Sequence, residues 1–222
     1  MMLLAVDTST AQVGLAVYDG AQVVGEYAWR SSQRHTTELA PAIFELLTRC
    51  GLTMNDIRAL GIALGPGSFT SLRVGVSLVK GFALARALPL VGIPTLDILA
   101  AAQPLSRHPL LTAIQAGRGR LAVGWYKRSK GRWKAKDPAR IVTAQALMDE
   151  VQSPVIVCAE LTAEERKTLT ANANIQLASP ANSIRRPAVL AELAWMRWQA
   201  GDVDDRATLA PIYLHVAEPI PA

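Results

Sequence analysis

The sequence predicts an α/β fold of two lobes, each a mixed β-sheet flanked by helices, with the second lobe smaller and degraded. Short apolar runs of strand length alternate with longer apolar stretches at helical spacing, which is typical of this class. A chain of 222 residues is long enough to bury the cores of one or two small lobes. We expect the lobes to span residues 1–103 and 104–222.

Three short strands open the chain. The first ends at Asp7 and is followed by hydroxyl residues beginning with Thr8 and Ser9, and Asp19-Gly20 is a hairpin signal between the next two. A strand–strand–strand–helix–strand–helix order is similar to the ribonuclease-H-like fold of actin, Hsp70 and sugar kinases. That likeness implies that the loop after Asp7 faces a nucleotide phosphate and that Asp7 helps to position Mg²⁺. Alternatively, Asp7 caps a turn and the hydroxyls pair with the backbone.

The first helix is expected over residues 38–50. Proline is tolerated only near the first turn of a helix, so Pro41 places the regular start close to residue 38. Phe44 lies outside the main apolar stripe and adds to a second apolar patch. The stripe itself includes Leu39, Ile43 and Leu47.

A glycine-proline turn follows the next buried strand. Gly65 and Gly67 permit positive φ and close backbone approach, and Pro66 stiffens the turn. Ser68 or Thr70 can cap the helix that follows, whose free N–H groups attract anions. The residues alone leave two interpretations open, a tight structural turn or a contact with a phosphate or a partner.

The second helix, about residues 70–87, is apolar nearly all round. A helix without a polar face must be covered on both sides, and its own sheet covers only one of them. A partner or the second lobe must cover the other. Ser77, Gly81 and Ala85 form a row of small residues along this helix, and the row permits close approach of another helix. With the first helix, we expect a partner interface of Leu39, Ile43, Phe44, Leu47, Arg73, Val74, Ser77, Leu78, Gly81, Phe82 and Ala85.

The second half of the sequence predicts shorter elements. Strands are expected over 110–114, 121–126 and 155–158. Helices are expected over 144–150 and over 187–200, where a proline opens the helix and a glycine follows it. The stretch 170–186 is expected to be a loop.

The excess positive charge is concentrated between Arg118 and Arg140, where nine basic residues face one acid, Asp137. Lys130-Gly131 predicts the turn of a hairpin in which tryptophans and a tyrosine alternate with the cations. Such a ribbon suits contact with RNA backbone and base stacking. The alternative is a solvated hairpin whose cation stems cover the aromatic rings. The candidate RNA contacts are Arg128, Lys130, Arg132 and Lys134.

Four segments together resemble the TsaB (YeaZ) family: LAVDTST at 4–10, HTTELAP at 35–41, GPGSFTSLRVG at 65–75 and GIPTL at 92–96. The likeness covers residues 1–103 and departs at Ser71, where the motif usually has glycine. It implies an accessory subunit of the cytoplasmic machinery that places threonylcarbamoyl on adenosine 37 of ANN-decoding tRNAs. The implied partners are the catalytic paralogue TsaD, the P-loop ATPase TsaE, tRNA through the complex, and a second copy of the chain.

The same resemblance implies that catalytic parts are missing. Active members of the superfamily with this ribonuclease-H-like fold have a glycine-rich turn that binds the adenosine of ATP. This chain has Ala159-Glu160-Leu161 at that place instead. TsaD holds a metal through two histidines at i and i+4, whereas here His35 is followed at that spacing by Leu39. We therefore expect no catalytic residue, metal or cofactor, with Asp7, Thr8 and Ser9 as remnants of a nucleotide site. The alternatives are a small ATP-dependent phosphotransferase that uses Asp7, and a glycopeptidase-like metalloprotein.

Other features restrict the class of protein. No apolar run approaches the roughly 18 residues that a membrane span needs, and no export signal is visible. The two cysteines, Cys50 and Cys158, lie far apart without metal-ligand spacing, which favours free thiols in a reducing cytoplasm. His108 and His215 have no companions at ligand spacing.

Overall fold

The computed structural model describes residues 1–31 and 35–214. The chain divides into two compact units: residues 1–98 with 185–212, and residues 99–184 with the last described residues. This division differs from a single boundary at residue 103, because the chain returns to the first unit at Arg185. The C-terminal helix therefore belongs to the first sheet and not to a second lobe.

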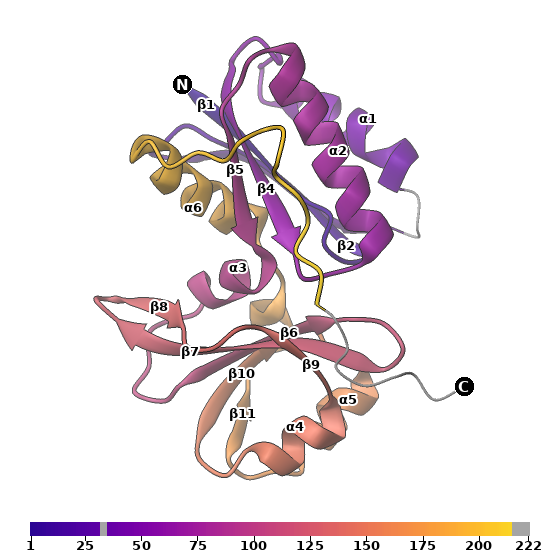
Figure 1. The fold of residues 1–222 in the computed structure, drawn as a ribbon, viewed down its shortest axis with the longest axis vertical. Helices are drawn as coiled ribbons and strands as arrows, with labels where there is room; N and C mark the ends of the chain where they lie inside the picture. The colour runs from indigo at the N-terminus through magenta and orange to yellow at the C-terminus, as the bar shows by residue number, and fades with distance from the viewer. Residues whose placement is uncertain (32–34, 215–222) are drawn as a thin grey trace. The chain divides into compact units, whose positions relative to one another are not determined.

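The first unit is built on a five-stranded mixed sheet in the order β3-β2-β1-β4-β5 (Figure 1). The first three strands pair antiparallel, and β1–β4 and β4–β5 pair parallel. The strands are β1 (Met2–Asp7), β2 (Gln12–Tyr18), β3 (Val23–Arg30), β4 (Ile57–Gly65) and β5 (Leu90–Pro94), and the helices are α1 (His35–Arg49), α2 (Phe69–Ala85), α3 (Thr95–Ala101) and α6 (Pro187–Gln199). The helix expected from residue 38 begins one turn earlier and keeps Pro41 inside it.

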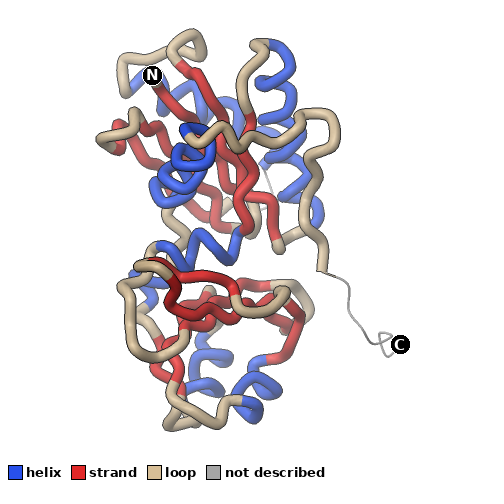
Figure 2. The backbone as a smooth tube through the Cα atoms, turned by 60° about the vertical axis from the view of Figure 1, so that its left-hand side comes forward, coloured by secondary structure: helices blue, strands red, loops and turns tan. Residues whose placement is uncertain are grey.

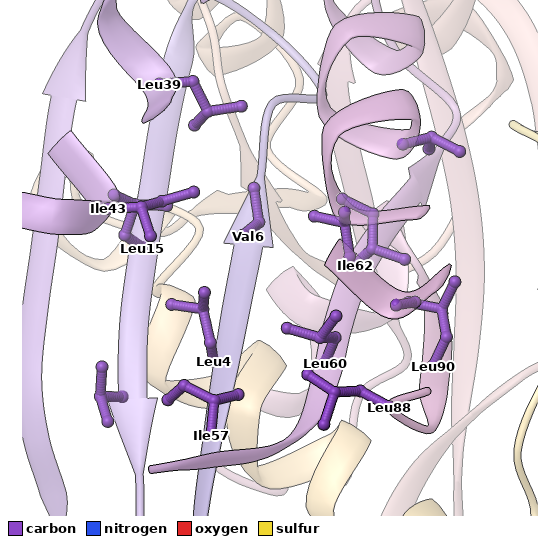
Figure 3. Close-up of a cluster of buried hydrophobic side chains, with 14 of the residues drawn as sticks. Leu4, Val6, Leu15, Leu39, Ile43, Ile57, Leu60, Ile62, Leu88 and Leu90 are labelled. Carbon is purple, nitrogen blue, oxygen red and sulfur yellow. The ribbon is translucent and has the colours of Figure 1, made fainter. Parts of the chain in front are cut away.

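Helices cover both faces of this sheet, with α1 and α2 on one side and α6 on the other (Figures 1 and 2). Successive residues of a strand point to opposite faces. Leu4 and Val6 of β1 therefore join the cluster under α1 and α2, whereas Leu3 and Ala5 meet α6. Figure 3 shows the first of these clusters, in which Ile43 of α1 lies beside Leu15 of β2. Burial on both faces explains why β1 is apolar along nearly its whole length.

The second unit has a six-stranded sheet, β11-β10-β6-β7-β8, with β9 paired to β7. Helices α4 and α5 pack with one face of it in a separate apolar cluster. The prediction of a loop over residues 170–186 is wrong, because this stretch contains β11 and the short 3₁₀ helix η1. The elements are β6 (Leu110–Gln115), β7 (Arg120–Ser129), β8 (Arg132–Ala135), β9 (Arg140–Thr143), α4 (Ala144–Glu150), β10 (Val155–Ala159), α5 (Ala163–Thr170), β11 (Ile175–Leu177) and η1 (Pro180–Ser183).

No helix in the described part of the chain combines the length and the apolar character that crossing a membrane requires.

Two glycines of α2 differ sharply in their surroundings. A Cβ atom at Gly75 would lie 2.1 Å from Oγ1 of Thr8, in the loop after β1, whereas a Cβ at Gly81 would meet nothing within 4 Å. Gly75 is therefore required by close packing of the helix on that loop. Gly81 is a free position on the outer face of the helix.

Gly75→Ala should lower the free energy of unfolding by about 1–3 kcal/mol, because the methyl group must displace Thr8. Gly81→Ala should raise it by about 0.5–1 kcal/mol, because alanine is the better helix former and has room. Urea unfolding of the two variants, which carry the same change in the same helix, measures the difference. Equal effects would show that α2 does not pack as described.

Candidate functional site

The loop after β1 is the candidate nucleotide site, and it is closed. Asp7, Thr8 and Ser9 are each no more than 2% exposed. Oδ1 of Asp7 accepts a hydrogen bond from the Ser9 amide at 2.8 Å. The Thr8 hydroxyl donates to the Ser71 carbonyl of α2 at 2.8 Å, and the Ser9 hydroxyl pairs with that of Thr95 at 2.7 Å. The polar groups that could hold a phosphate are therefore engaged within the chain.

A buried arginine completes the closure. Arg185 is 1% exposed and has the largest volume of the fully buried side chains in the described chain. Its Nε donates to Oδ2 of Asp7 at 2.7 Å, and its Nη2 donates to Oγ1 of Thr10 at 3.0 Å and to the Gln12 carbonyl at 2.9 Å. The guanidinium thus neutralises the carboxylate that would otherwise face a cation, and it ties the start of α6 to the first hairpin.

Arg185 could not be found from the sequence, because it lies in a stretch expected to be a loop, 178 positions from Asp7. Local periodicity carries no information on such a contact. Arg185 is the first of two adjacent arginines before a helix-opening proline, and the sequence gives no signal that separates the buried ion pair from the solvated side chain. The exposed neighbour Arg186 shows this, because it makes a surface pair with Glu26 instead.

The glycine-proline turn packs against the same loop. A Cβ atom at Gly67 would lie 2.1 Å from the Ser9 carbonyl oxygen, which itself accepts a hydrogen bond from the Ser68 amide at 2.7 Å. The Gly65 amide donates to Oγ1 of Thr95 at 2.9 Å, with the Gly65 φ at +105°. Of the two interpretations that the residues left open, these contacts favour a tight structural turn. The glycines let two backbone segments meet where a side chain would keep them apart.

The carboxyl ends of β6 and β10 in the second unit are also occupied. The Gln115 side-chain amide donates to the Glu160 carbonyl at 3.1 Å and to Oε2 of Glu165 at 2.6 Å. Glu165 is 8% exposed and forms a capping box with Thr162 at the start of α5. Side chains thus fill the edge at which open α/β sheets usually admit ligands. The turn after β10, which the structure describes in full, has no glycine to give an adenosine close backbone approach.

His35, which the sequence analysis considered as a metal ligand, contacts the backbone of the loop after β1. Nε2 of His35 lies 3.3 Å from the Thr10 carbonyl oxygen, and the side chain is buried. Within the described residues, no group of three or more His, Cys, Asp or Glu side chains could hold a metal ion. His108 lies beside Arg107, and His215 falls outside the described residues.

The predicted partner face divides into buried and available residues. Leu39, Ile43 and Leu47 are at most 1% exposed and pack in the core of the first unit, so the interface prediction fails for them. Phe44 is 52% exposed on α1. On α2 the row of Ser77, Gly81 and Ala85 and the charged Arg73 are exposed, and Val74, Leu78 and Phe82 are partly buried. Two further exposed side chains were missed: Leu84, and Phe69, which lies 3.6 Å beneath the Arg73 guanidinium.

An open groove of about 670 Å³ lies between β3 and α1. Its acids are paired locally: Glu26 with Arg186 and the Ala188 amide, Glu38 with Nε1 of Trp29, and Glu45 with Arg49. None of the residues of the loop after β1 lines it. The groove is a feature of the α1 surface and is separate from the closed loop.

Comparison with protein families gives one match that covers most of the chain. The model of the family described as TsaD, tRNA N6-adenosine threonylcarbamoyltransferase, matches residues 25–187. The tRNA threonylcarbamoyladenosine biosynthesis protein TsaB of Escherichia coli is 30% identical over 155 residues, 68% of this chain and 67% of that protein. TsaB of Bacillus subtilis is 29% identical over 226 residues, 98% of this chain and 96% of that protein.

Solved structures agree on the fold. YeaZ from Pseudomonas aeruginosa superimposes with a TM-score of 0.77 at 21% identity, over 96% of this chain and 99% of that one. A dehydratase activator from Clostridium difficile with bound ADPNP gives a TM-score of 0.55 at 10% identity, over 90% and 97% of the two chains. The ribonuclease-H-like fold expected from the strand order, with its actin-like and sugar-kinase relatives, is confirmed.

Arg185→Met should lower the free energy of unfolding by about 3–5 kcal/mol, because it leaves the Asp7 carboxylate buried without a counter-charge. The matched change Arg186→Met removes a pair whose arginine is 61% exposed, and it should cost no more than about 1 kcal/mol. Replacing both partners, Asp7→Asn with Arg185→Gln, should cost less than the two single changes added together. Similar costs for Arg185→Met and Arg186→Met in urea unfolding would contradict the buried pair.

Proposed function

The chain belongs to the TsaB (YeaZ) family, and on that premise we propose that it is a non-catalytic accessory subunit in the synthesis of N6-threonylcarbamoyladenosine in tRNA. The proposal places it in the cytoplasm, where it binds a TsaD-like catalytic paralogue and helps to recruit a TsaE-like ATPase. Position 37 of ANN-decoding tRNAs is the proposed target of the assembled complex. The chain contributes a surface to this complex and no reacting group.

The closed loop after β1 is the observation that carries this proposal. A phosphotransferase of this fold needs a carboxylate free to position Mg²⁺ and donors free to bind phosphate. Here Arg185 is paired with Asp7, and the hydroxyls of Thr8 and Ser9 are bound to the chain itself. Opening the loop to a nucleotide would expose a buried ion pair and break these hydrogen bonds, which is costly. This argues against the phosphotransferase alternative, and nothing in the described residues favours a metallopeptidase.

The outer face of α1 and α2 is the proposed docking surface. Phe44, Phe69 and Leu84 are each more than half exposed, which is unusual for large apolar side chains in a small domain. Gly81 leaves open space on the same helix as Leu84. A partner helix can approach closely along the row of Ser77, Gly81 and Ala85 and cover the aromatic groups beside it. The same face would serve a homodimer when the paralogue is absent.

Gly81→Leu should weaken binding of a purified TsaD-like paralogue more than tenfold, because the side chain holds the two helices apart. The isolated variant should keep its fold, since a Cβ at this position meets no neighbour within 4 Å. Titration calorimetry measures the affinity, and thermal melting checks the fold. Gly81→Ala is the matched control and should bind far better than the leucine variant. A folded leucine variant that binds with wild-type affinity would place the interface elsewhere.

The isolated chain should neither hydrolyse ATP nor retain zinc or iron at stoichiometric levels. Phosphate release and elemental analysis of the pure protein measure these two properties. The Asp7→Asn/Arg185→Gln variant separates a genuine activity from a contaminant, since a contaminant remains when the loop is changed. Steady phosphate release that this variant abolishes, or about one metal ion per chain, would contradict the accessory role.

A further inference from the structure

The ribbon formed by β7 and β8 has one face made of cations. Lys127 of β7 lies directly opposite Lys134 of β8, and Ser129 lies opposite Arg132. The Lys136 amide donates to the Trp125 carbonyl at 2.7 Å, which extends the pairing by one step. Alternation along the strands then puts four side chains on the same face. We call these four residues, Lys127, Arg132, Lys134 and Lys136, the cationic face.

Acidic side chains of the described chain do little to neutralise this face. Directly opposed side chains on an antiparallel pair lie about 4.5–5.5 Å apart at Cβ, and like charges at that distance repel. Lys136 makes a 4.0 Å ion pair with Asp137 in which both side chains are about 60% exposed, so the pair is weak. Elsewhere in this unit Glu150 pairs with Arg140 and Glu165 with Thr162. An anion from outside the chain would therefore relieve the repulsion.

The aromatic rings of the ribbon are largely covered by the chain itself. Trp133 lies opposite Arg128 and so points to the other face, where its Nε1 donates to the Gln103 carbonyl at 3.2 Å. Trp125 lies on the same face as Lys127, opposite Lys136, but it is half-buried and packs against the apolar cluster of the second unit. Tyr126 is 4% exposed. Of the two alternatives, these contacts favour a ribbon whose rings pack against the chain, so base stacking is not part of the binding that we infer. Arg128, predicted as an RNA contact, faces away from Lys127 and its neighbours.

The chemistry of this face selects one class of partner. Residues 118–140 expose no large apolar side chain, so the ribbon lacks the anchor that a membrane-surface segment needs. Protein interfaces are built around apolar and aromatic anchors and are depleted in lysine. A ribbon that offers only closely spaced cations suits a repeating line of negative charge, which is the phosphate backbone of a nucleic acid. The second unit's described part to residue 184 holds twelve basic and six acidic residues, in agreement with this.

We propose that the cationic face binds the phosphate backbone of tRNA by charge alone, without reading bases; the choice of tRNA rests on the proposed function. Lys130, at the turn with a φ of 49°, lies at the tip of the same ribbon and adds to the field. Arg128 takes no part. Binding of this kind positions the tRNA and leaves sequence recognition to other contacts.

The test measures binding of a tRNA transcript to the isolated full chain by fluorescence anisotropy over a range of salt concentrations. Lys127→Gln/Arg132→Gln/Lys134→Gln should weaken binding and lower the log–log salt slope by about 0.7–0.9 for each phosphate that the variant no longer neutralises. The matched variant Arg58→Gln/Arg107→Gln/Lys167→Gln removes the same charge from exposed positions elsewhere and should keep the wild-type slope. Arg128→Gln alone should also keep it.

Three results would overturn the proposal. These are wild-type protein without salt-dependent tRNA binding, an equal decrease of affinity in the two triple variants, and binding to vesicles of anionic lipid but not to tRNA. Single variants of Lys127 and Lys134 give the same comparison if the triple variant fails to fold. Titration of the triple variant with the TsaD-like paralogue separates the two proposals. If the triple variant binds both the paralogue and tRNA as the wild type does, only the proposal for the cationic face is rejected. If the wild-type chain does not bind the paralogue, the accessory role is rejected.

Discussion

The buried pair between Asp7 and Arg185 is the contact on which the first unit depends. A charged side chain that is 1% exposed is stable only when it is neutralised and hydrogen-bonded, and Arg185 meets both conditions through Asp7, Thr10 and Gln12. The contact fixes the point at which the chain returns from the second unit. It thereby positions α6, whose Leu190 and Ala194 cover one face of the sheet.

The same ion pair connects the fold with the proposal that the chain has no catalytic activity. In a working nucleotide site, a carboxylate at the end of the first strand is kept available for a cation that arrives with the ligand. Here the cation is part of the chain, and the helix and turn around Gly75 and Gly67 pack directly on the loop. The outer face of α1 and α2 and the cationic face of the ribbon are both exposed in the described chain. Both are suited to binding a macromolecule, the first by its exposed apolar groups and the second by its charge.

The sequence predicted the fold well where the information is local. Strand-length apolar runs indicated most strands of both sheets, and the glycine-proline turn and apolar α2 were recognised from their residues. Local patterns failed where a distant contact decides the outcome: α6 was assigned to the wrong unit, and Arg185 was missed. Leu39 and Ile43 show a related limit, because an apolar stripe does not say whether its own sheet or a partner covers it. In the ribbon of β7 and β8, the strand register shows that the cationic face and Trp133 lie on opposite faces, which composition alone does not show.

Reconstituted tRNA modification with a TsaD-like paralogue tests the central claim most directly. The chain to compare with wild type is Asp7→Asn/Arg185→Gln, which alters the closed loop and leaves the outer face of α1 and α2 unchanged. If the chain acts only as a binding subunit, the variant supports modification at the wild-type rate once partner binding is saturated. A rate that falls by orders of magnitude, with fold and partner affinity intact, would show that the loop takes part in the reaction.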